Sequence, residues 1–334
     1  MPRDVIVIGA SSGGVDPLIK LVRGLPATLP AAVFIVLHVR PDAPSQLPAI
    51  LNRAGELPAA HAVDGELIRR GRIYVAPPDL QTYIHRGRLS VRRGPQENAS
   101  RPAIDPLFRT ASHHYGPRVI GVVLSGALDD GSAGLVAVKK GGGIAVIQDP
   151  EEASVPDMPA NARDRADVDL IVSSGELGAV LAQLVTEDGG GEALLQEVPL
   201  ETMEEAADDE PTPKTEELGI ASGLTCPDCH GALWEIDDGK SIRYRCRVGH
   251  AYSEDAIIKA QTESVERALW AALRALEERV ALIRRLADSA RSRGHESIAD
   301  LYEARTRQVQ DDVNALHNVI ATGGTLEPVG SNGG

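Results

Sequence analysis

A series of short apolar runs in the first half of the chain places the strongest constraint on its fold. The clearest runs occupy residues 5–8, 32–37, 119–124 and 143–147, and β-branched residues are common in them. A strand without a polar face is buried on both sides, as it is in a parallel sheet that helices cover on both faces. The sequence therefore predicts a doubly wound α/β domain with a mostly parallel sheet over residues 1–186.

The remaining elements of this domain are predicted from the same patterns. Further strands are expected at 72–76, within 83–91 and at 169–172, and amphipathic helices at 16–24, within 45–55 and at 104–114, 131–140 and 175–185. In a sheet of this kind, functional groups gather beyond the carboxyl ends of the strands. The residues that follow the apolar runs are therefore the first place to look for a site.

The first apolar run leads directly into the glycine-rich turn GASSGG at residues 9–14. Such a turn either binds the phosphates of a nucleotide or raises a nucleophile. No tyrosine has a lysine four residues later, the second run ends in a basic stretch without an acid, and the turn holds no Gly-Lys-Ser/Thr. These absences argue against a nucleotide site. The Gly-x-Ser-x-Gly pattern favours Ser11 as a nucleophile, with the backbone N–H groups of Ser12 and Gly13 as candidate oxyanion donors.

Two further polar residues follow neighbouring predicted strands. His38 ends the second apolar run, and Asp130 lies shortly after the run at 119–124. Because the carboxyl ends of parallel strands share one edge of a sheet, Ser11, His38 and Asp130 are expected to converge as a Ser–His–Asp triad. A histidine of the core and an aspartate that caps the next helix are the alternatives at the last two positions.

Six stretches of this domain occur together in one enzyme family: VIGASSGGVD, FIVLHVRPD, GRIYVAPPD, RPAIDPLFRTAS, GVVLSGALDDGSAGL and SVPDMPANA. With them, residues 4–186 resemble the catalytic domain of chemotaxis protein-glutamate methylesterases, the CheB family. The resemblance implies hydrolysis of glutamate γ-methyl esters on methyl-accepting chemoreceptors, and in many members deamidation of receptor glutamines. It also implies that Ser11 is the nucleophile, His38 the base and Asp130 the orienting acid, with no cofactor for catalysis.

The chain departs from the family pattern in three places. Ser12 stands where the family often has threonine, and Ala127-Leu128-Asp129 stands where it often has Met-Gly-Asn. Asp129 is therefore an additional acid beside the predicted triad acid. The family usually carries an N-terminal phospho-receiver domain, whereas only four residues precede the first run here. We therefore expect regulation to come from the second half of the chain or from a partner.

Acidic residues are concentrated in one stretch behind this domain. Most of the formal net charge of −14 lies between residues 187 and 217, where twelve Asp or Glu accompany a single lysine. Glycine and proline are frequent there and large apolar residues are few, so we predict a flexible acidic linker at 187–218. The rest of the chain is close to neutral, which argues against nucleic-acid binding.

All three cysteines of the chain lie in one short segment that has the spacing of a metal site. Cys226 and Cys229 form a C-x2-C pair, and Cys246 follows after sixteen residues as part of C-x3-H with His250. This spacing is typical of a zinc ribbon with a closed, structural Zn site. A hairpin of 232–236 and 241–245 is expected to join the two pairs in a module at 219–252. His230 is an alternative ligand, and three free core cysteines are the alternative interpretation.

The remaining chain has the pattern of two helices. Apolar residues recur at three- and four-residue steps from Val265 to Leu286 and from Ile298 to Ile320, with a break at 293–295. We predict an antiparallel helical hairpin at 253–321, with Ser253 as its N-cap and a disordered tail at 322–334. The hairpin packs on itself or on the ribbon, or serves for self-association or for docking to a receptor or signalling partner.

Two sequence-wide absences bear on location. The chain has no signal peptide and no apolar run long enough to span a bilayer, so we expect a cytoplasmic protein without membrane insertion. The alternative to an esterase is a non-catalytic signalling scaffold that keeps the methylesterase fold and binds partners through the ribbon and the hairpin.

Overall fold

The computed structural model describes residues 3–41, 44–187, 219–237 and 242–322. Almost all of the predicted linker and tail lie outside these residues. The chain forms two compact units, residues 1–257 and 258–334, and each is described by itself.

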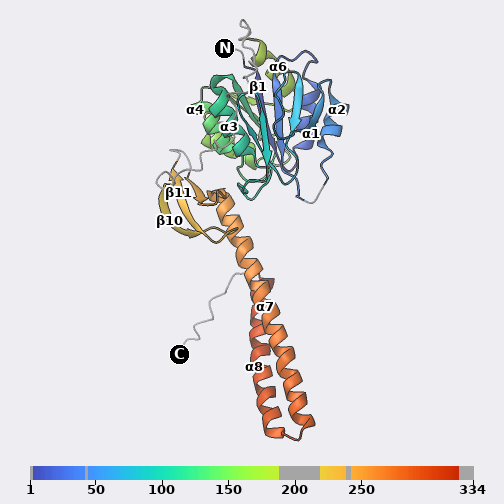
Figure 1. Ribbon diagram of the computed structural model, residues 1–334, viewed down its shortest axis with the longest axis vertical. Coiled ribbons are helices and arrows are strands. Elements are labelled where there is room, and N and C mark those ends of the chain that lie inside the picture. The colour runs from blue at the N-terminus through green and yellow to red at the C-terminus, as the bar shows by residue number, and fades with distance from the viewer. Residues whose placement is uncertain (1–2, 42–43, 188–218, 238–241, 323–334) are drawn as a thin grey trace. The chain divides into compact units, whose positions relative to one another are not determined.

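The first unit is built on a parallel sheet of seven strands in the order β3-β4-β2-β1-β7-β8-β9 (Figure 1). The strands are β1 (Val5–Ala10), β2 (Ala32–Leu37), β3 (Ala59–His61), β4 (Arg72–Val75), β7 (Val119–Val123), β8 (Ile144–Gln148) and β9 (Leu170–Val172). The first strand lies in the middle, between β2 and β7, so the residues that follow these three strands meet at one edge. The predicted α/β fold is confirmed.

Helices cover both faces of this sheet. They are α1 (Val15–Arg23), α2 (Leu47–Ala54), α3 (Ile104–Tyr115), α4 (Ser132–Lys140), α5 (Asp157–Arg165) and α6 (Leu177–Glu187), with a 3-10 turn η1 (Gly116–Arg118). Side chains of β1 alternate between two cores: Val5 and Val7 pack with α3, α4 and α5, whereas Ile6 and Ile8 pack with α1, α2 and α6. Burying each of these side chains contributes about 1.5–3 kcal/mol. A strand that serves two cores has no polar face, as its sequence predicts.

A small antiparallel hairpin lies beside α3 on this unit. It consists of β5 (Gln81–Ile84) and β6 (Leu89–Arg92), which overlap the stretch 83–91 predicted to form strands and extend beyond it at both ends. Two elements of the first domain were not predicted. Strand β3 has only three residues, and α5 buries only Met158, Pro159 and Ala162, so neither has a recognisable apolar pattern.

The ribbon forms a four-stranded antiparallel sheet in the order β10-β11-β12-β13. The strands are β10 (Ile220–Thr225), β11 (Ala232–Asp237), β12 (Ile242–Cys246) and β13 (Ala251–Ser253). The central pair is the predicted hairpin, and the two outer strands were not predicted. Few large side chains are buried in this sheet, chiefly Leu233 and Tyr252. Its apolar core is therefore small.

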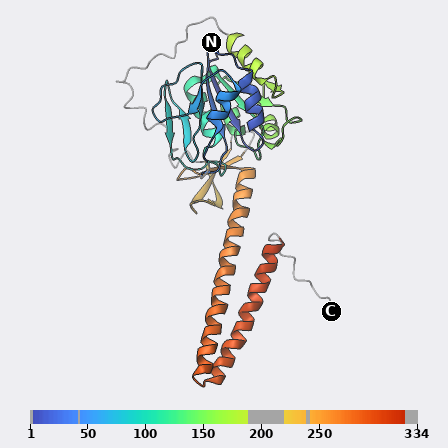
Figure 2. The same cartoon turned by 90° about the vertical axis from the view of Figure 1, so that its right-hand side faces the viewer.

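Two long helices form the rest of the described chain, as predicted. Helix α7 (Glu254–Ser292) and helix α8 (Glu296–Ala321) run antiparallel, and Figures 1 and 2 show them side by side. Their shared core is a small cluster of five buried side chains, with partly buried ones packed against it: Leu273, Val280, Ile283, Val309 and Val313. Among the described helices, none combines the length and the apolar character that a membrane span requires.

Candidate active site and metal centre

Ser11 lies in the tight turn between β1 and α1. Its backbone N–H donates to the carbonyl of Ser125 at 3.0 Å, which ties the turn to the segment after β7. A Cβ at Gly126 would come within 2.7 Å of the Ser11 Cβ, so this close approach requires glycine. Gly13 has a φ of +74°, a left-handed conformation that glycine adopts without strain. The small residues of both segments therefore place the serine at the sheet edge.

His38 and Asp130 lie next to Ser11 at this edge. The His38 Nδ1 is 3.2 Å from the Ser11 Oγ, and its Nε2 is 2.8 Å from the Asp130 Oδ2. Because a carboxylate only accepts hydrogen bonds, this geometry assigns the imidazole hydrogen to Nε2 and leaves Nδ1 to accept from the serine hydroxyl. We call these three residues the Ser–His–Asp cluster. Its members come from loops after β1, β2 and β7.

Asp130 is held as an anion by a dense set of donors. Its side chain is 2% exposed, and burial alone would raise its pKa. Hydrogen bonds and the charge of His38, with further donors, instead hold the pKa of Asp130 below its usual range. These further donors are the backbone N–H groups of Ile104, Asp105 and Gly131 and the side-chain amide of Asn98. Two of the N–H groups belong to the first turn of α3, whose dipole favours a negative charge. Asp130 thus accepts hydrogen bonds from two free N–H groups at the start of α3. At α4 it accepts only from its neighbour Gly131, the N-cap residue, so it is not the N-cap of that helix.

A second buried carboxyl group, Asp105, lies beside Asp130. It accepts hydrogen bonds from the backbone of Gly131 and Gly134 at 3.0 and 2.7 Å and from the Asn98 amide at 3.2 Å. Burial and the charge of Asp130 raise the pKa of Asp105 to about 8. Of the two neighbours, Asp130 is therefore the better stabilised anion. Sequence reasoning missed Asp105 and Asn98; the only signal for Asp105 was an acid in the first turn of a predicted helix.

The two candidate oxyanion donors lie on the exposed side of the serine turn. Ser12 and Gly13 are exposed. Within the described part of the chain, no protein acceptor is bonded to the N–H of either residue. By contrast, the Ser12 carbonyl is occupied by the Ser125 hydroxyl at 3.0 Å. Both N–H groups are thus free to donate to a bound molecule.

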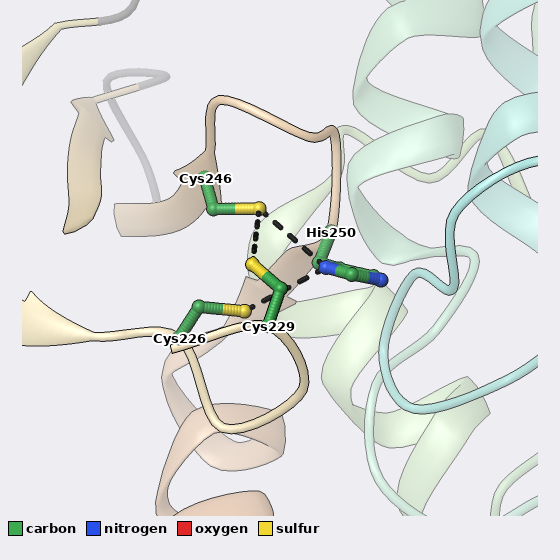
Figure 3. Close-up of side chains that lie close together, drawn as sticks. All are labelled: Cys226, Cys229, Cys246 and His250. Carbon is green, nitrogen blue, oxygen red and sulfur yellow. Dashed lines mark hydrogen bonds between the residues drawn. The ribbon is translucent and has the colours of Figure 1, made fainter. Parts of the chain in front are cut away.

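The four predicted metal ligands come together in the ribbon. Cys226 follows β10, Cys229 lies in the next turn, Cys246 ends β12 and His250 precedes β13. Their donor atoms lie within 4.8 Å of one another, with separations of 3.5–3.7 Å between the bonded pairs (Figure 3). Metal–ligand bonds of about 2.3 Å in a tetrahedron place donors about 3.7 Å apart. Three thiols and an imidazole at these distances fit a tetrahedral zinc ion.

Two alternatives for the cysteines receive no support from this geometry. His230 is exposed and has a φ of +58°, and it does not belong to the cluster of donor atoms. The three cysteines form no disulfide with one another. They are also not scattered through a core, since each thiol faces another ligand of the set.

Comparisons with known proteins concern the first domain. Residues 6–181 match the family model described as CheB methylesterase. A relative from Leptospira interrogans, named a putative protein-glutamate methylesterase/protein-glutamine glutaminase, is 35% identical over 185 residues, which are 55% of this chain and 96% of the relative. A protein-glutamate methylesterase/protein-glutamine glutaminase 2 from Methanosarcina mazei is 33% identical over 191 residues, 55% of this chain and 52% of the relative.

A solved structure has the same fold over the same share of the chain. The catalytic domain of the Thermotoga maritima CheB methylesterase is 29% identical, with a TM-score of 0.52. The likeness covers 55% of this chain and all of that domain. The family-model match ends before the ribbon begins.

Proposed function

The chain belongs to the CheB methylesterase family, as the motifs of its first domain predict, and we propose that it hydrolyses glutamate γ-methyl esters on methyl-accepting chemoreceptors. The observation that carries the proposal is the continuous hydrogen bonding from Ser11 through His38 to Asp130 at the carboxyl edge of the sheet. The relatives' names include glutaminase, so the proposal extends to deamidation of receptor glutamines.

The proposed reaction proceeds through an acyl-enzyme. His38 Nδ1 accepts the proton of the Ser11 hydroxyl while the Oγ attacks the ester carbonyl carbon. The negative oxygen of the tetrahedral intermediate accepts hydrogen bonds from the N–H groups of Ser12 and Gly13. The imidazolium then protonates the methoxy oxygen, the C–O bond breaks and methanol leaves. With a glutamine substrate, ammonia leaves at this step.

A second half-reaction restores the serine. His38 accepts one proton from water, the hydroxide attacks the acyl carbon, and His38 returns that proton to the Ser11 Oγ as the bond between Oγ and the acyl carbon breaks. The glutamic acid side chain that forms then releases the second proton of the water to solvent and leaves as a carboxylate. Throughout, Asp130 keeps the imidazole hydrogen on Nε2 and stabilises the imidazolium that forms twice. None of these steps needs a cofactor, because each proton transferred between reacting groups is held by a side chain of the cluster.

We further propose that residues 219–252 bind one structural zinc ion. Cys226, Cys229, Cys246 and His250 would hold it, and their thiolates and imidazole suit this metal. Zinc binding would supply folding free energy that the small apolar core of the ribbon lacks. Four protein ligands leave no open position, so the ion takes no part in hydrolysis.

The location and the partners of the chain remain predictions from its sequence and its family. We propose a cytoplasmic enzyme, because reducing conditions keep three thiols available for metal. Its protein substrate is the cytoplasmic part of a receptor. Self-association through α7 and α8, or docking of a signalling partner there, stays a prediction from the sequence.

The direct test measures methanol released from methylated receptor by the full chain. Ser11→Ala removes the nucleophile and should lower the rate by more than about 10³-fold. Ser90→Ala, on β6 of the same domain, is the matched control and should keep the wild-type rate. A fluorophosphonate probe should label the wild-type chain at Ser11. Release of methanol by Ser11→Ala at the wild-type rate would contradict the proposal, and an unlabelled wild-type serine would favour the scaffold alternative.

A further inference from the structure

The last strand of the ribbon pairs with a segment of the first domain, within the first compact unit. The Asn98 N–H donates to the Ala251 carbonyl at 2.8 Å, and the Ala251 N–H donates to the Gln96 carbonyl at 3.3 Å. A Cβ at Gly249 would come within 2.8 Å of the Pro95 Cγ, so the glycine lies close to the proline ring. β13 therefore continues as a short parallel pairing with residues 96–98.

Asn98 connects this strand to the Ser–His–Asp cluster. Its side chain is buried, and its Oδ1 accepts from the Ser253 N–H at 2.9 Å. Its Nδ2 donates to Asp130 Oδ1 at 3.0 Å and to Asp105 Oδ2 at 3.2 Å. The amide thus uses its acceptor on the ribbon and both donors on the two buried carboxyl groups. Its φ of +50° is a left-handed conformation that asparagine tolerates better than most residues.

Asp129 binds the same point of the ribbon. Its buried carboxylate accepts from the Ser253 hydroxyl at 2.5 Å and pairs with Arg165, which also contacts Asp255 at 3.1 Å. Burial raises the pKa of Asp129, while the hydrogen bond from Ser253 and the charge of Arg165 oppose this. The additional acid that departs from the family pattern is therefore a contact with the ribbon.

We propose that the ribbon is a built-in positioning element of the active site, acting through Asn98. The inference rests on the proposed hydrolase function. With β13 in place, Ser253 fixes the amide so that Nδ2 faces Asp130. Without β13, the Asn98 Oδ1 loses the Ser253 N–H that donates to it, and the Asn98 N–H loses its acceptor, the Ala251 carbonyl. Asp130 then loses an oriented donor. Asn98 and Ser253 are positioning residues. Their described hydrogen bonds act on Asp130 directly or through Asn98, and neither residue is bonded to Ser11 or His38.

This role predicts a loss in turnover without a loss in substrate binding. Asn98→Gly removes the amide and suits the left-handed backbone, so it should lower kcat about tenfold or more with little change in KM. Asn52→Ala is the matched control, because that asparagine also donates and accepts one hydrogen bond each, with Ala59 at 2.7 and 2.8 Å, far from the site. It should lower the melting temperature without lowering kcat.

The link to the ribbon is tested at Ser253. Ser253→Pro removes the N–H that Asn98 accepts, whereas Ser253→Ala keeps it. The proline variant should lose about as much kcat as Asn98→Gly, and the alanine variant much less. If both act through one bond, the double variant Asn98→Gly/Ser253→Pro should be no slower than either single variant. Melting temperature and metal content are measured for each, so that unfolding of a variant is recognised.

Fluorophosphonate labelling of Ser11 is measured alongside methanol release, because it needs the cluster but no receptor. A wild-type chain that does neither overturns the proposed function and this inference with it. A wild-type chain that is labelled, with folded Asn98→Gly and Ser253→Pro variants labelled at the same rate, overturns the inference alone. Additive losses in the double variant, or losses confined to KM, also overturn it.

Discussion

The Ser–His–Asp cluster and the Cys₃His cluster bring side chains from distant segments together in two different ways. The first lies at the edge of a seven-stranded sheet with a buried core on each face. The second lies in four short strands with few large buried side chains. In the first, the carboxylate already has five protein donors. In the second, the three thiols and the His250 imidazole chiefly face one another. The first site is held by its fold, whereas under our proposal the second needs a bound metal ion to hold its fold.

Metal removal should give the largest difference between the two sites. Structural zinc binds such ligand sets with about 10 kcal/mol or more, so a chelator should unfold the ribbon and leave the main sheet folded. Amide hydrogen exchange followed by peptide mass spectrometry should show lost protection at 219–237 and 242–253, with protection kept at β1 and β7. Cys229→Ser should behave as the chelated chain. Less than one zinc per carefully purified chain, or unchanged exchange after chelation, would show the metal site to be wrong.

The second largest effect is expected at the acid of the cluster. Asp130→Asn should lower kcat about 10⁴-fold, or about 5.5 kcal/mol. An amide has only one acceptor atom, so its NH2 group would face hydrogen-bond donors in the place of either Oδ1 or Oδ2. Methanol release measures this loss, and zinc content should stay the same. Asp169→Asn alters an aspartate that accepts from Lys139 and Ala145 elsewhere on the sheet, and should keep the wild-type rate. A loss below tenfold for Asp130→Asn would remove this residue from the mechanism.

A core substitution sharpens the claim that the fold holds the first site. Ile6 is fully buried on β1, and Ile6→Ala should lower the free energy of unfolding by about 3 kcal/mol through a lost contact and a cavity. Urea titration measures it. Ile171→Ala, at a side chain that is 52% exposed on β9, should change stability far less. Equal losses at the two positions would mean that the sheet core does not set stability.

The smallest effect is expected in the helical hairpin, whose buried core is a small cluster. Val309 is 4% exposed, and Val309→Ala should destabilise the hairpin by about 1.5 kcal/mol. Val265 on α7 is 58% exposed and provides the control. Circular dichroism at the helix minimum during thermal unfolding follows the change. If Val265→Ala is as unstable as Val309→Ala, then Val265 packs in the core and the exposed face of α7 is wrongly assigned.

The predictable parts of the molecule are those encoded in local patterns. Apolar runs predict the central strands, and their order along the chain brings Ser11, His38 and Asp130 to one edge. In the same way, the spacing of the three cysteines and His250 predicts that these four side chains come together. Asn98 could not be predicted, because its role depends on a contact with Ser253, 155 positions away in the sequence. Asp105 could not be predicted because its role depends on the loop after β7, where it accepts from Gly131 and Gly134. β3, α5, β10 and β13 were missed because short or sparsely apolar elements leave too few periodic positions.

That separation of 155 residues has a consequence during synthesis. At about 5–20 residues per second, Ser253 emerges from the ribosome roughly 10–30 s after Asn98. Throughout that interval the nascent first domain can fold around its sheet, but the strand that fixes Asn98 does not yet exist. Under our proposal, the chain would reach full turnover only when translation has passed the ribbon, which ties the onset of activity to synthesis of that segment.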